Sequence, residues 1–303
     1  MYRQILKILN NNKKYTIEQL ATKLSINIDE LCIIIKKLET YGIKLNHPTT
    51  NTYQLIEAIE LLDAKLIKSK LIDSSVELEI FDVLNSTNKY ALDKTDFNKP
   101  LICLAEYQTA GYGRQGSNWI SPYASGLCLS IRHDYITKSD GLSIALAVTI
   151  ARVLYNLGIV DVGLKWPNDI LWEQRKLAGL LLESIFGKKI VIGIGINVRM
   201  PKNDDISQPW VDIATILKKV PSRNTLTIEL INNCLETLVN YPKTGLNPFL
   251  KDWQFFDLSY GKSVTLYTDD GYIRGTADGI DGRGALRINN QSYICGSLRL
   301  TNY

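Results

Sequence analysis

The hydrophobic periodicity of the chain changes near residue 62, and this change constrains the fold more than any other feature of the sequence. Before it, leucine and isoleucine recur at helical spacing, at Ile5, Leu6, Ile8, Leu9, Ile17, Leu20, Leu24, Leu31, Ile34, Ile35 and Leu38. This spacing predicts three short helices. From about residue 66, short apolar runs alternate with helical stretches, a pattern typical of α/β domains.

Start and stop signals complete the pattern of the first region. Thr16 and Asn27 each precede an apolar stretch and have Gln or Glu three residues later, the spacing of a capping box. Gly42 follows the third helix, where a left-handed cap favours glycine. Residues 43–55 then read as two short strands and a turn. Three helices and a hairpin predict a winged helix-turn-helix over residues 1–62.

The third helix leaves DNA binding open. A recognition helix meets base edges near its N-terminal end, and here that end carries Asp29 and Glu30, which phosphates repel. Lys36 and Lys37 lie further along. Residues 1–62 therefore fit either a DNA-binding module or a small helical cap that only packs.

The middle of the chain alternates strands with helices. Apolar strand-like runs lie at 102–105, 127–131 and 180–183, and a helical stretch covers about 141–157. Together they predict a mixed α/β domain of catalytic size over residues 66–253. The helical stretch is interrupted by polar residues and is shorter than the roughly 20 apolar residues of a membrane span. We therefore expect a buried helix and no membrane partner.

The last segment, residues 255–303, changes to short strands. Apolar runs at 263–267 and 285–288 are accompanied by turn signals at 269–271 and 281–282. This pattern predicts a small β-barrel.

Composition excludes several kinds of site. The five cysteines contain no CxxC pair, which argues against a disulfide framework or a zinc site. Only two histidines are present, His47 and His133, so a Ser-His-Asp triad or a histidine-rich metal centre is not expected. The net charge of +4 is too small to indicate a nucleic-acid or membrane partner. No signal-peptide core follows Met1, and we expect a cytoplasmic protein with reduced thiols.

The first chemical signal is a glycine-rich segment, residues 111–116, which reads GYGRQG. A dinucleotide-binding fingerprint would need a helix to begin within these glycines. Residues 117–126 instead contain proline, glycine and serine, which indicate a long loop. Such a loop can close over a ligand that carries phosphate or carboxylate, with Arg114 as a planar charge, or it can be a plain surface loop.

Two further segments carry charge and bare backbone. Residues 165–169 read KWPND and residues 175–179 read RKLAG. Their lysines reach one anion if a hairpin joins the two segments; on a solvated face they spread into water instead. In the strand 191–197, alternation puts Gly193 and Gly195 on the same side, where they leave room for a ligand close to the backbone.

Together these segments resemble the biotin protein ligase family, in particular its bifunctional ligase and biotin-operon repressor members. The resemblance runs in order through residues 86–88, 108–119, 165–169, 175–179, 193–197, 279–281 and 284–286. It covers essentially the whole chain. It implies an α/β multi-domain protein with an N-terminal winged helix-turn-helix, a central biotin and ATP-binding domain and a C-terminal SH3-like β-barrel. It also implies an ATP-dependent ligase that forms biotinyl-5′-AMP and transfers biotin to a lysine of the biotin carboxyl carrier protein of acetyl-CoA carboxylase.

The resemblance also implies site residues. Those expected at biotin are Ser86, Thr87, Asn88, Gln108, Tyr112, Gly113, Arg114, Lys176, Gly179, Gly193 and Gly195. Those expected at ATP or the adenylate are Gly111, Arg114, Lys165, Asn168, Lys176, Asn197 and Trp210. Arg114 and Lys176 would bring the biotin carboxylate and the α-phosphate together, and Asp169 would orient or deprotonate the acceptor amine. Magnesium would arrive with ATP, and no metal site on the protein is expected.

The ureido ring of biotin needs both hydrogen-bond donors and acceptors, which hydroxyls and amides supply. The glycine loop departs from the usual GRGRxG pattern at Tyr112 and Gln115. We expect Tyr112 to contribute stacking or loop closure in place of charge. A lipoate ligase, whose pocket is long and apolar, and a repressor that senses biotin without catalysis are the alternatives. The partners implied are the carrier protein, operator DNA through residues 1–62 and a second copy of the chain.

Overall fold

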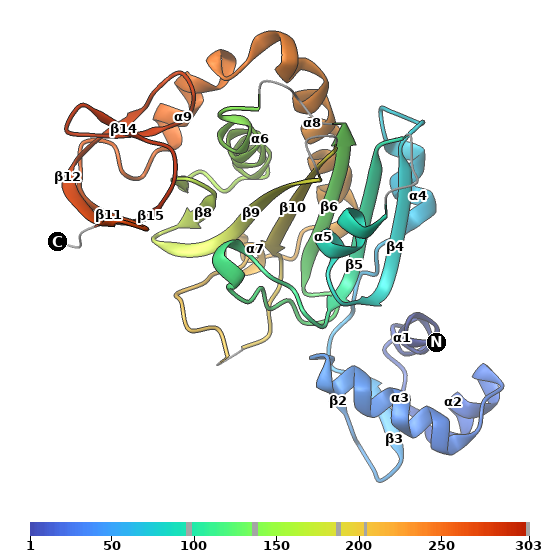
Figure 1. Cartoon of the computed structure of the whole chain (residues 1–303). Coiled ribbons are helices and arrows are strands. Elements are labelled where there is room, and N and C mark those ends of the chain that lie inside the picture. Colours follow the sequence, from blue (N-terminus) through green and yellow to red (C-terminus); the bar gives the residue numbers. More distant parts are fainter. Residues whose placement is uncertain (95–98, 135–138, 186–188, 203–204, 301–303) are drawn as a thin grey trace.

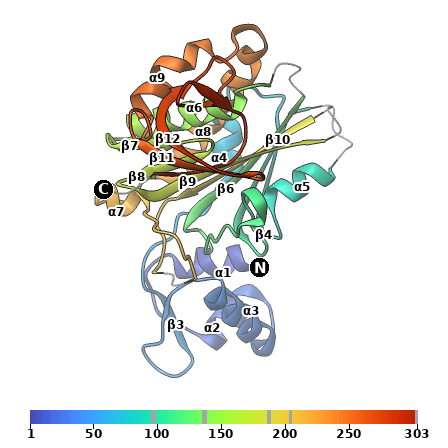
Figure 2. The ribbon, with the colours of Figure 1, turned by 60° about the vertical axis from the view of Figure 1, so that its left-hand side comes forward.

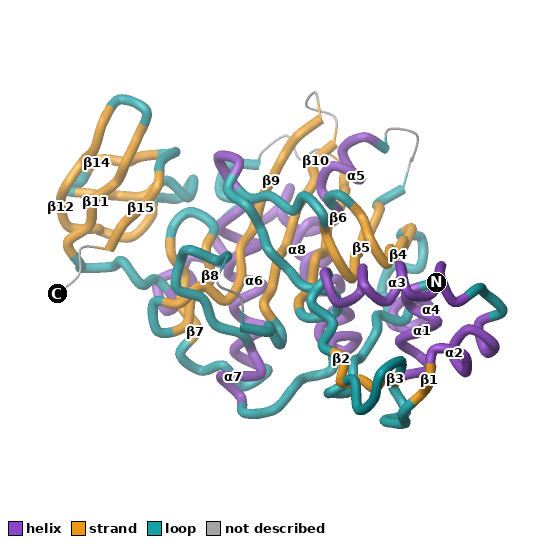
Figure 3. Tube along the Cα trace, turned by 90° about the horizontal axis from the view of Figure 1, so that it is seen from below, coloured by secondary structure: helices purple, strands orange, loops and turns teal. Residues whose placement is uncertain are grey.

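We describe the protein from a computed structural model that covers residues 1–94, 99–134, 139–185, 189–202 and 205–300 (Figure 1). The strands described form three separate sheets of three, seven and five strands. The first helices and the last strands lie at opposite ends of the molecule, with the large sheet between them (Figure 3).

The N-terminal region has the elements predicted from its periodicity. Its helices and strands are α1 (Tyr2–Leu9), β1 (Tyr15–Thr16), α2 (Ile17–Leu24), α3 (Ile28–Thr40), β2 (Leu45–Asn46) and β3 (Thr52–Leu55). Thr16 caps α2 in a complete capping box with Gln19. Asn27 caps α3 by accepting from the backbone N–H of Glu30, and Gly42 beyond α3 has φ +96°. The two-residue strand β1 was not predicted; it pairs with β3 beside the expected hairpin.

The central sheet carries the rest of the predicted α/β pattern. Its strands are β4 (Glu77–Leu84), β5 (Leu101–Gln108), β6 (Gly126–Asp134), β7 (Val162–Lys165), β8 (Asp169–Trp172), β9 (Arg175–Ile185) and β10 (Lys189–Asn197). They lie in the order β4-β5-β6-β10-β9-β8-β7, with β4 and β5 parallel and the other pairs antiparallel. This order places β6 beside β10, so segments distant in the sequence share one face.

Helices cover the two faces of the sheet unequally (Figures 1 and 2). They are α4 (Ala64–Lys70), α5 (Thr87–Asp93), α6 (Leu142–Asn156), α7 (Ile213–Leu217), α8 (Arg223–Thr244) and α9 (Leu250–Phe256). The helix predicted at 141–157 is α6; its apolar residues pack with those of α8 in the main core. The short helix α5 packs on the other face, where Ala91 meets Leu101 and Val191. Among the residues described, no helix has the length and apolarity to cross a membrane.

The C-terminal strands form one antiparallel sheet. They are β11 (Ser263–Thr268), β12 (Gly271–Ile280), β13 (Leu286–Ile288), β14 (Gln291–Tyr293) and β15 (Ser297–Leu300), in the order β14-β13-β12-β11-β15. Within the described residues, β14 and β15 are its edges, so the pairings form a five-stranded sheet and not the closed barrel that the turn spacing predicted. Trp166 Nε1 donates to Gly284 O at 3.0 Å and ties this sheet to the central one.

A buried carboxylate joins the N-terminal region to the central sheet. Glu106 on β5 accepts from Arg223 Nη2 at 2.8 Å and from Arg3 Nη2 at 3.3 Å. It also accepts from the backbone N–H of Leu62 at 2.7 Å. Arg3 lies on α1, Leu62 on the connection and Arg223 at the start of α8. One buried charge is therefore satisfied from three parts of the chain.

Candidate active site

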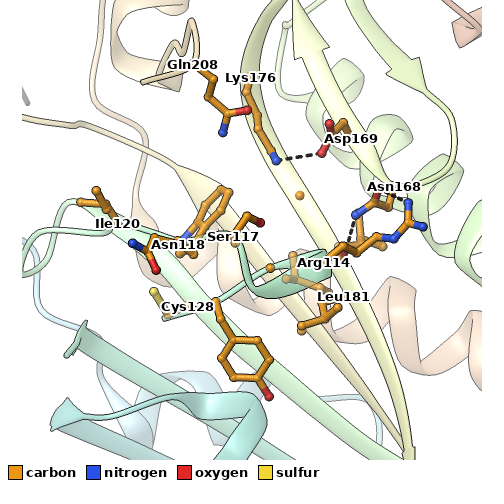
Figure 4. Close-up of a pocket in the computed structure, with 18 of the residues that line it drawn as sticks. Arg114, Ser117, Asn118, Ile120, Cys128, Asn168, Asp169, Lys176, Leu181 and Gln208 are labelled. Carbon is orange, nitrogen blue, oxygen red and sulfur yellow. Dashed lines mark hydrogen bonds and ion pairs between the residues drawn. The ribbon is translucent and has the colours of Figure 1, made fainter. Parts of the chain in front are cut away.

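A cavity of about 540 Å³ opens on the face of the central sheet that carries α5 (Figure 4). This is the size of an ordinary small-molecule site. The residues expected at a ligand that line it are Ser86, Thr87, Asn88, Gln108, Tyr112, Gly113, Arg114, Asn168, Asp169, Lys176, Gly179, Gly193, Gly195, Asn197 and Trp210. They come from α5, the glycine loop, four strands and the segment after β10. The segments singled out separately in the sequence thus meet in one place.

Two of the expected residues, Gly111 and Lys165, are not among those that line the cavity. Gly111 is buried, and its carbonyl accepts from the backbone N–H of Trp119 at 2.9 Å, which closes the base of the glycine loop. A Cβ on Gly111 would lie 2.5 Å from Trp119 O, so this close approach requires glycine. Lys165 faces Asp169 from β7, with 4.0 Å between Nζ and Oδ2.

One end of the cavity is neutral and rich in hydrogen-bonding groups. The amide N–H and the hydroxyl of Thr87 both donate to Gln108 Oε1, at 2.7 and 3.1 Å. Ser130 Oγ lies 2.8 Å from Thr87 Oγ1 and 2.6 Å from Asn88 Oδ1. Ser86 caps α5 through Lys89 N, which fixes the start of this helix against the sheet. These side chains are oriented by one another before any ligand enters.

The floor of the cavity is the bare face of β10. A Cβ on Gly193 would lie 2.4 Å from Asn88 Oδ1, and a Cβ on Gly195 would lie 2.3 Å from Trp119 Cε2. Contacts this short would force the facing side chain to move, so glycine at both positions keeps Asn88 and Trp119 in place. The prediction that the two glycines share one side of the strand is confirmed.

The other end of the cavity is cationic. The β8–β9 hairpin brings Lys176 Nζ within 2.8 Å of Asp169 Oδ1 (Figure 4). Burial lowers the pKa of Lys165 and outweighs the opposing effect of Asp169, while Lys176 and Arg299 lower it further. The two lysines therefore share one carboxylate, and a second anion would relieve their repulsion. That both lysines reach an anionic ligand stays a prediction.

Arg114 reaches this end from the glycine loop. Its Nη1 lies 3.4 Å from Asn168 Oδ1, and its Nη2 lies 3.4 Å from Gly296 O. Both contacts are long for hydrogen bonds, so the guanidinium remains available to an anion. Asn168 is held more firmly, because its Nδ2 donates to Leu180 O at 2.7 Å.

Asn197 and Trp210 lie beside Lys176. Asn197 Nδ2 donates to Lys176 O at 3.2 Å and to Val211 O at 3.1 Å. The backbone of Lys176 forms a bridge with Trp210, whose half-buried ring lines the cavity. The segment after β10 is thereby attached to β9, the strand that carries Lys176.

Three side chains that the sequence did not single out are Trp119, which lines the cavity, and Ser130 and Glu183, which hydrogen-bond to the lining residue Asn88. Trp119 contacts Gly195, and its indole N–H is buried without a hydrogen-bond partner among the described groups. Glu183 lies two and four residues beyond Leu181 and Gly179 on β9, so alternation could have indicated its face. Ser130 was within a predicted strand, but nothing local shows which residues it meets.

The described residues offer little to a protein-bound metal. They contain no group of three or more His, Cys, Asp or Glu side chains placed to hold an ion. Two carboxylates line the cavity, Asp169 and Asp205, and Asp169 is already paired with lysine. The donor set does not fit a resident metal. All five cysteines are free thiols.

Comparison with known proteins gives consistent results. A family profile described as "Biotin/lipoate A/B protein ligase family" matches residues 80–198. The bifunctional ligase/repressor BirA of Escherichia coli (strain K12) is 34% identical over 302 residues, covering 96% of this chain and 93% of that protein. The biotin–[acetyl-CoA-carboxylase] ligase of Mycobacterium tuberculosis is 27% identical over 243 residues, covering 75% of this chain and 90% of that protein.

A solved structure shows the same fold. The biotin protein ligase from Aquifex aeolicus, in complex with biotin and ATP, has a TM-score of 0.67 at 23% identity. The match covers 74% of this chain and 99% of that chain.

Proposed function

The chain belongs to the biotin/lipoate A/B protein ligase family and is a biotin ligase, and from this premise we propose how its residues perform the two half-reactions. The observation that carries the proposal is the polarity of the cavity. Along β9 and β10 the register runs from Gly193 opposite Leu181 to Gly195 opposite Gly179, and Lys176 lies beyond. A ligand along these strands would have a neutral group among hydroxyls and amides and an anionic group at the cations.

Biotin fits this polarity. Its ureido ring would lie at the neutral end, where Ser86, Thr87, Asn88 and Gln108 supply donors and acceptors. Gln108 Oε1 already accepts two hydrogen bonds from Thr87, so we expect this side chain to act as a donor toward the ligand. A lipoate ligase would need an apolar pocket at this end, because each buried polar group without a partner costs about 1–3 kcal/mol. The neutral end therefore favours biotin over lipoate.

In the first half-reaction, a biotin carboxylate oxygen attacks the α-phosphorus of ATP. The bond from this phosphorus to the bridging oxygen breaks, and pyrophosphate leaves as biotinyl-5′-AMP forms. Lys176 and Arg114 would hold both anions and stabilise the charge that builds up on the α-phosphate. Trp210 and Asn197 would lie against the adenylate, on the side of the cavity formed by the end of β10 and the segment that follows it. Magnesium would enter with the triphosphate, and no step is assigned to a metal held by the protein.

In the second half-reaction, the amine of an acceptor lysine attacks the carbonyl carbon of biotinyl-5′-AMP. The amide bond forms, and the bond from that carbon to the phosphate oxygen breaks, so AMP leaves. Asp169 would orient the amine or take its proton, since its carboxylate lies in the cavity wall beside Lys176. The acyl adenylate is already activated, so positioning and exclusion of water supply most of the remaining acceleration. We expect the acceptor to be the biotin carboxyl carrier protein of acetyl-CoA carboxylase.

The decisive experiment combines the purified chain, biotin, ATP and a biotin carboxyl carrier domain. Transfer of biotin to the carrier, with no transfer of lipoate under the same conditions, is the expected result. Binding of biotin without any transfer would leave only the sensing repressor.

A second function, repression, follows from the N-terminal region. We propose that residues 1–62 form a winged helix-turn-helix, residues 66–253 the biotin and ATP-binding domain and residues 255–303 an SH3-like domain. Three helices, of which α2 and α3 carry side-chain caps, and the β2–β3 hairpin support the first of these, and the similarity to a bifunctional ligase/repressor extends over 96% of the chain. Operator DNA and a second copy of the chain are the partners expected.

The acidic start of α3 is the observation against DNA binding. Asp29 and Glu30 lie in its first turn and Lys37 in its last. A gel-shift experiment with operator DNA, with and without biotin and ATP, tests repression. Binding that appears only with both substrates is expected; no shift under any condition would leave residues 1–62 a packing domain.

A further inference from the structure

Glu183, a carboxylate that neither half-reaction uses, lies beside the neutral end of the cavity. Its Oε2 accepts two hydrogen bonds, from Asn88 Nδ2 at 2.7 Å and from Tyr112 Oη at 2.9 Å. Asn88 belongs to α5, and Tyr112 belongs to the glycine loop. One oxygen atom on β9 therefore joins the two segments that enclose this end.

The position of Glu183 follows from the alternation of β9. Gly179 and Leu181 line the cavity, and Glu183 is the next residue on the same face. It pairs across the sheet with Val191, which packs beneath α5. Glu183 thus lies at the edge of the cavity, under α5 and within reach of the loop.

The first partner, Asn88, is fixed by this contact. Its amide nitrogen donates to Glu183, so its Oδ1 is directed to Ser130 and lies over Gly193. Without the carboxylate, the amide could turn over and present the opposite donor and acceptor pattern to a ligand. Glu183 therefore determines the hydrogen-bonding pattern of a predicted biotin residue.

The second partner, Tyr112, links the carboxylate to the glycine loop. Burial and the hydrogen bond to Glu183 raise the pKa of Tyr112 above its ordinary value, so its hydroxyl stays protonated and donates at neutral pH. Tyr112 also forms a backbone bridge with Asn118, and Gly113 N donates to Ser117 O at 2.7 Å. These backbone bonds hold the loop together as one folded unit, and the hydroxyl of Tyr112 attaches this unit to Glu183 on β9.

We propose that Glu183 is a positioning residue of the biotin site, whose carboxylate holds the glycine loop against the sheet and sets the orientation of the Asn88 amide. It acts through these two side chains and does not touch the reacting atoms. It therefore controls how tightly biotin and biotinyl-5′-AMP are retained. This inference rests on the proposed placement of biotin at the neutral end.

The test uses Glu183→Gln and Tyr112→Phe, alone and together, in the full chain. Hydrogen bonds to charged groups are the strong ones, so each single variant should raise the KM for biotin and the dissociation rate of biotinyl-5′-AMP about tenfold. The KM for ATP and the unfolding midpoint should stay near those of the unmodified chain. Glu183→Gln weakens the Tyr112–Glu183 bond by removing the charge, and Tyr112→Phe removes this bond, so the double variant should be less impaired than the product of the single effects.

Matched controls are Glu173→Gln in the neighbouring β8–β9 turn and Tyr272→Phe on β12, both exposed. Wild-type KM for biotin and wild-type adenylate retention in both single variants would overturn the proposal. So would single effects that multiply fully in the double variant, or a lowered midpoint with unchanged KM. Tyr112→Phe removes only a hydroxyl, so the proposal stays testable if Glu183→Gln does not fold. If the unmodified chain itself fails to bind biotin, the proposed function fails instead, and the two failures are distinguished.

Discussion

The N-terminal helices and the ligand cavity are built by different kinds of interaction. In the N-terminal region, the side-chain bonds that start α2 and α3 join residues three apart, Thr16 with Gln19 and Asn27 with Glu30. In the cavity, Thr87 meets Gln108 across 21 residues and Asn88 meets Glu183 across 95. The difference suggests that local bonds set stability in the first region, whereas distant bonds set chemistry in the second.

The two regions also differ in how they present polar groups. In the cavity, hydroxyls, amides and cations converge on one space and orient one another (Figure 4). On α3, acids and lysines stand in solvent beside Ile28 and Ile33, which are 42% and 59% exposed. The arrangement of polar groups in the cavity therefore indicates a class of substrate, whereas the scattered side chains on α3 do not indicate a DNA sequence.

The largest effect is expected from breaking the buried ion pair between Glu106 and Arg223, and it tests whether bonds between distant residues also contribute stability. Arg223→Met leaves the buried Glu106 with Arg3 as its remaining charged partner. Breaking a buried ion pair in this way costs about 3–5 kcal/mol. We expect a free energy of unfolding lower by an amount near the bottom of this range, measured by urea denaturation. A loss below 1 kcal/mol would show that the junction carries little of the stability.

The next effect is chemical. Lys176→Ala removes the cation expected at the α-phosphate, while Lys165 remains near Asp169. Loss of one transition-state contact of this kind slows catalysis about 10²–10³-fold. Biotin-dependent pyrophosphate exchange should fall accordingly, with little change in the unfolding midpoint. Full exchange in this variant would overturn the site assignment; the exposed Lys243→Ala is its control.

A smaller effect is expected at the floor of the cavity. Gly195→Ala places a Cβ 2.3 Å from the ring of Trp119, which must move. Such overpacking costs about 1–3 kcal/mol, and biotin should bind about tenfold more weakly in calorimetric titration. Gly282→Ala is the matched control, because a Cβ there has no atom within 4 Å. Equal affinity in both variants would contradict the close packing at the floor.

In the N-terminal region, where local bonds start the helices, we expect a loss of stability without a loss of function. Thr16→Ala removes the cap of α2 and should lower the free energy of unfolding by about 1 kcal/mol. The exposed Thr22→Ala, inside the same helix, should show no such loss. Biotin transfer should be unchanged in both variants. A changed KM for biotin in Thr16→Ala would break the separation between the two regions.

The smallest expected effect is a dependence of stability on pH through the carboxylate of Glu60. Burial acts to raise the pKa of Glu60, but hydrogen bonds from Asn224, Ser222 and the backbone of Arg223 lower it overall. A lowered pKa means that Glu60 contributes stability above the ordinary carboxyl pKa of about 4.3 and loses it as the pH falls through the lower folded-state value. The difference in midpoint between the unmodified chain and Glu60→Gln should therefore shrink between pH 6 and about pH 3. A constant difference would rule out this linkage.

Much of the fold follows from short-range patterns. The periodicity predicted α1 to α3 and the buried helix α6, and Thr16 marked the start of α2. Gly193 and Gly195 were correctly placed on one side of a strand. In place of the expected β-barrel, the described C-terminal strands pair as an open five-stranded sheet. Turn positions specify hairpins but do not specify whether the outer strands meet. The strand β1 was missed since two residues carry no periodicity.

The sequence alone determined the helices α1, α2, α3 and α6, because capping bonds and side-chain period act within a few residues. It also raised the possibility that Lys165 and Lys176 come close together; the β7–β8 and β8–β9 pairings bring both to Asp169. Only the tertiary structure decided that Trp119 covers Gly195 and that Glu183 meets both Asn88 and Tyr112. These contacts depend on the strand order that sets β6 beside β10 and β10 beside β9, and that order arises from packing of the whole sheet.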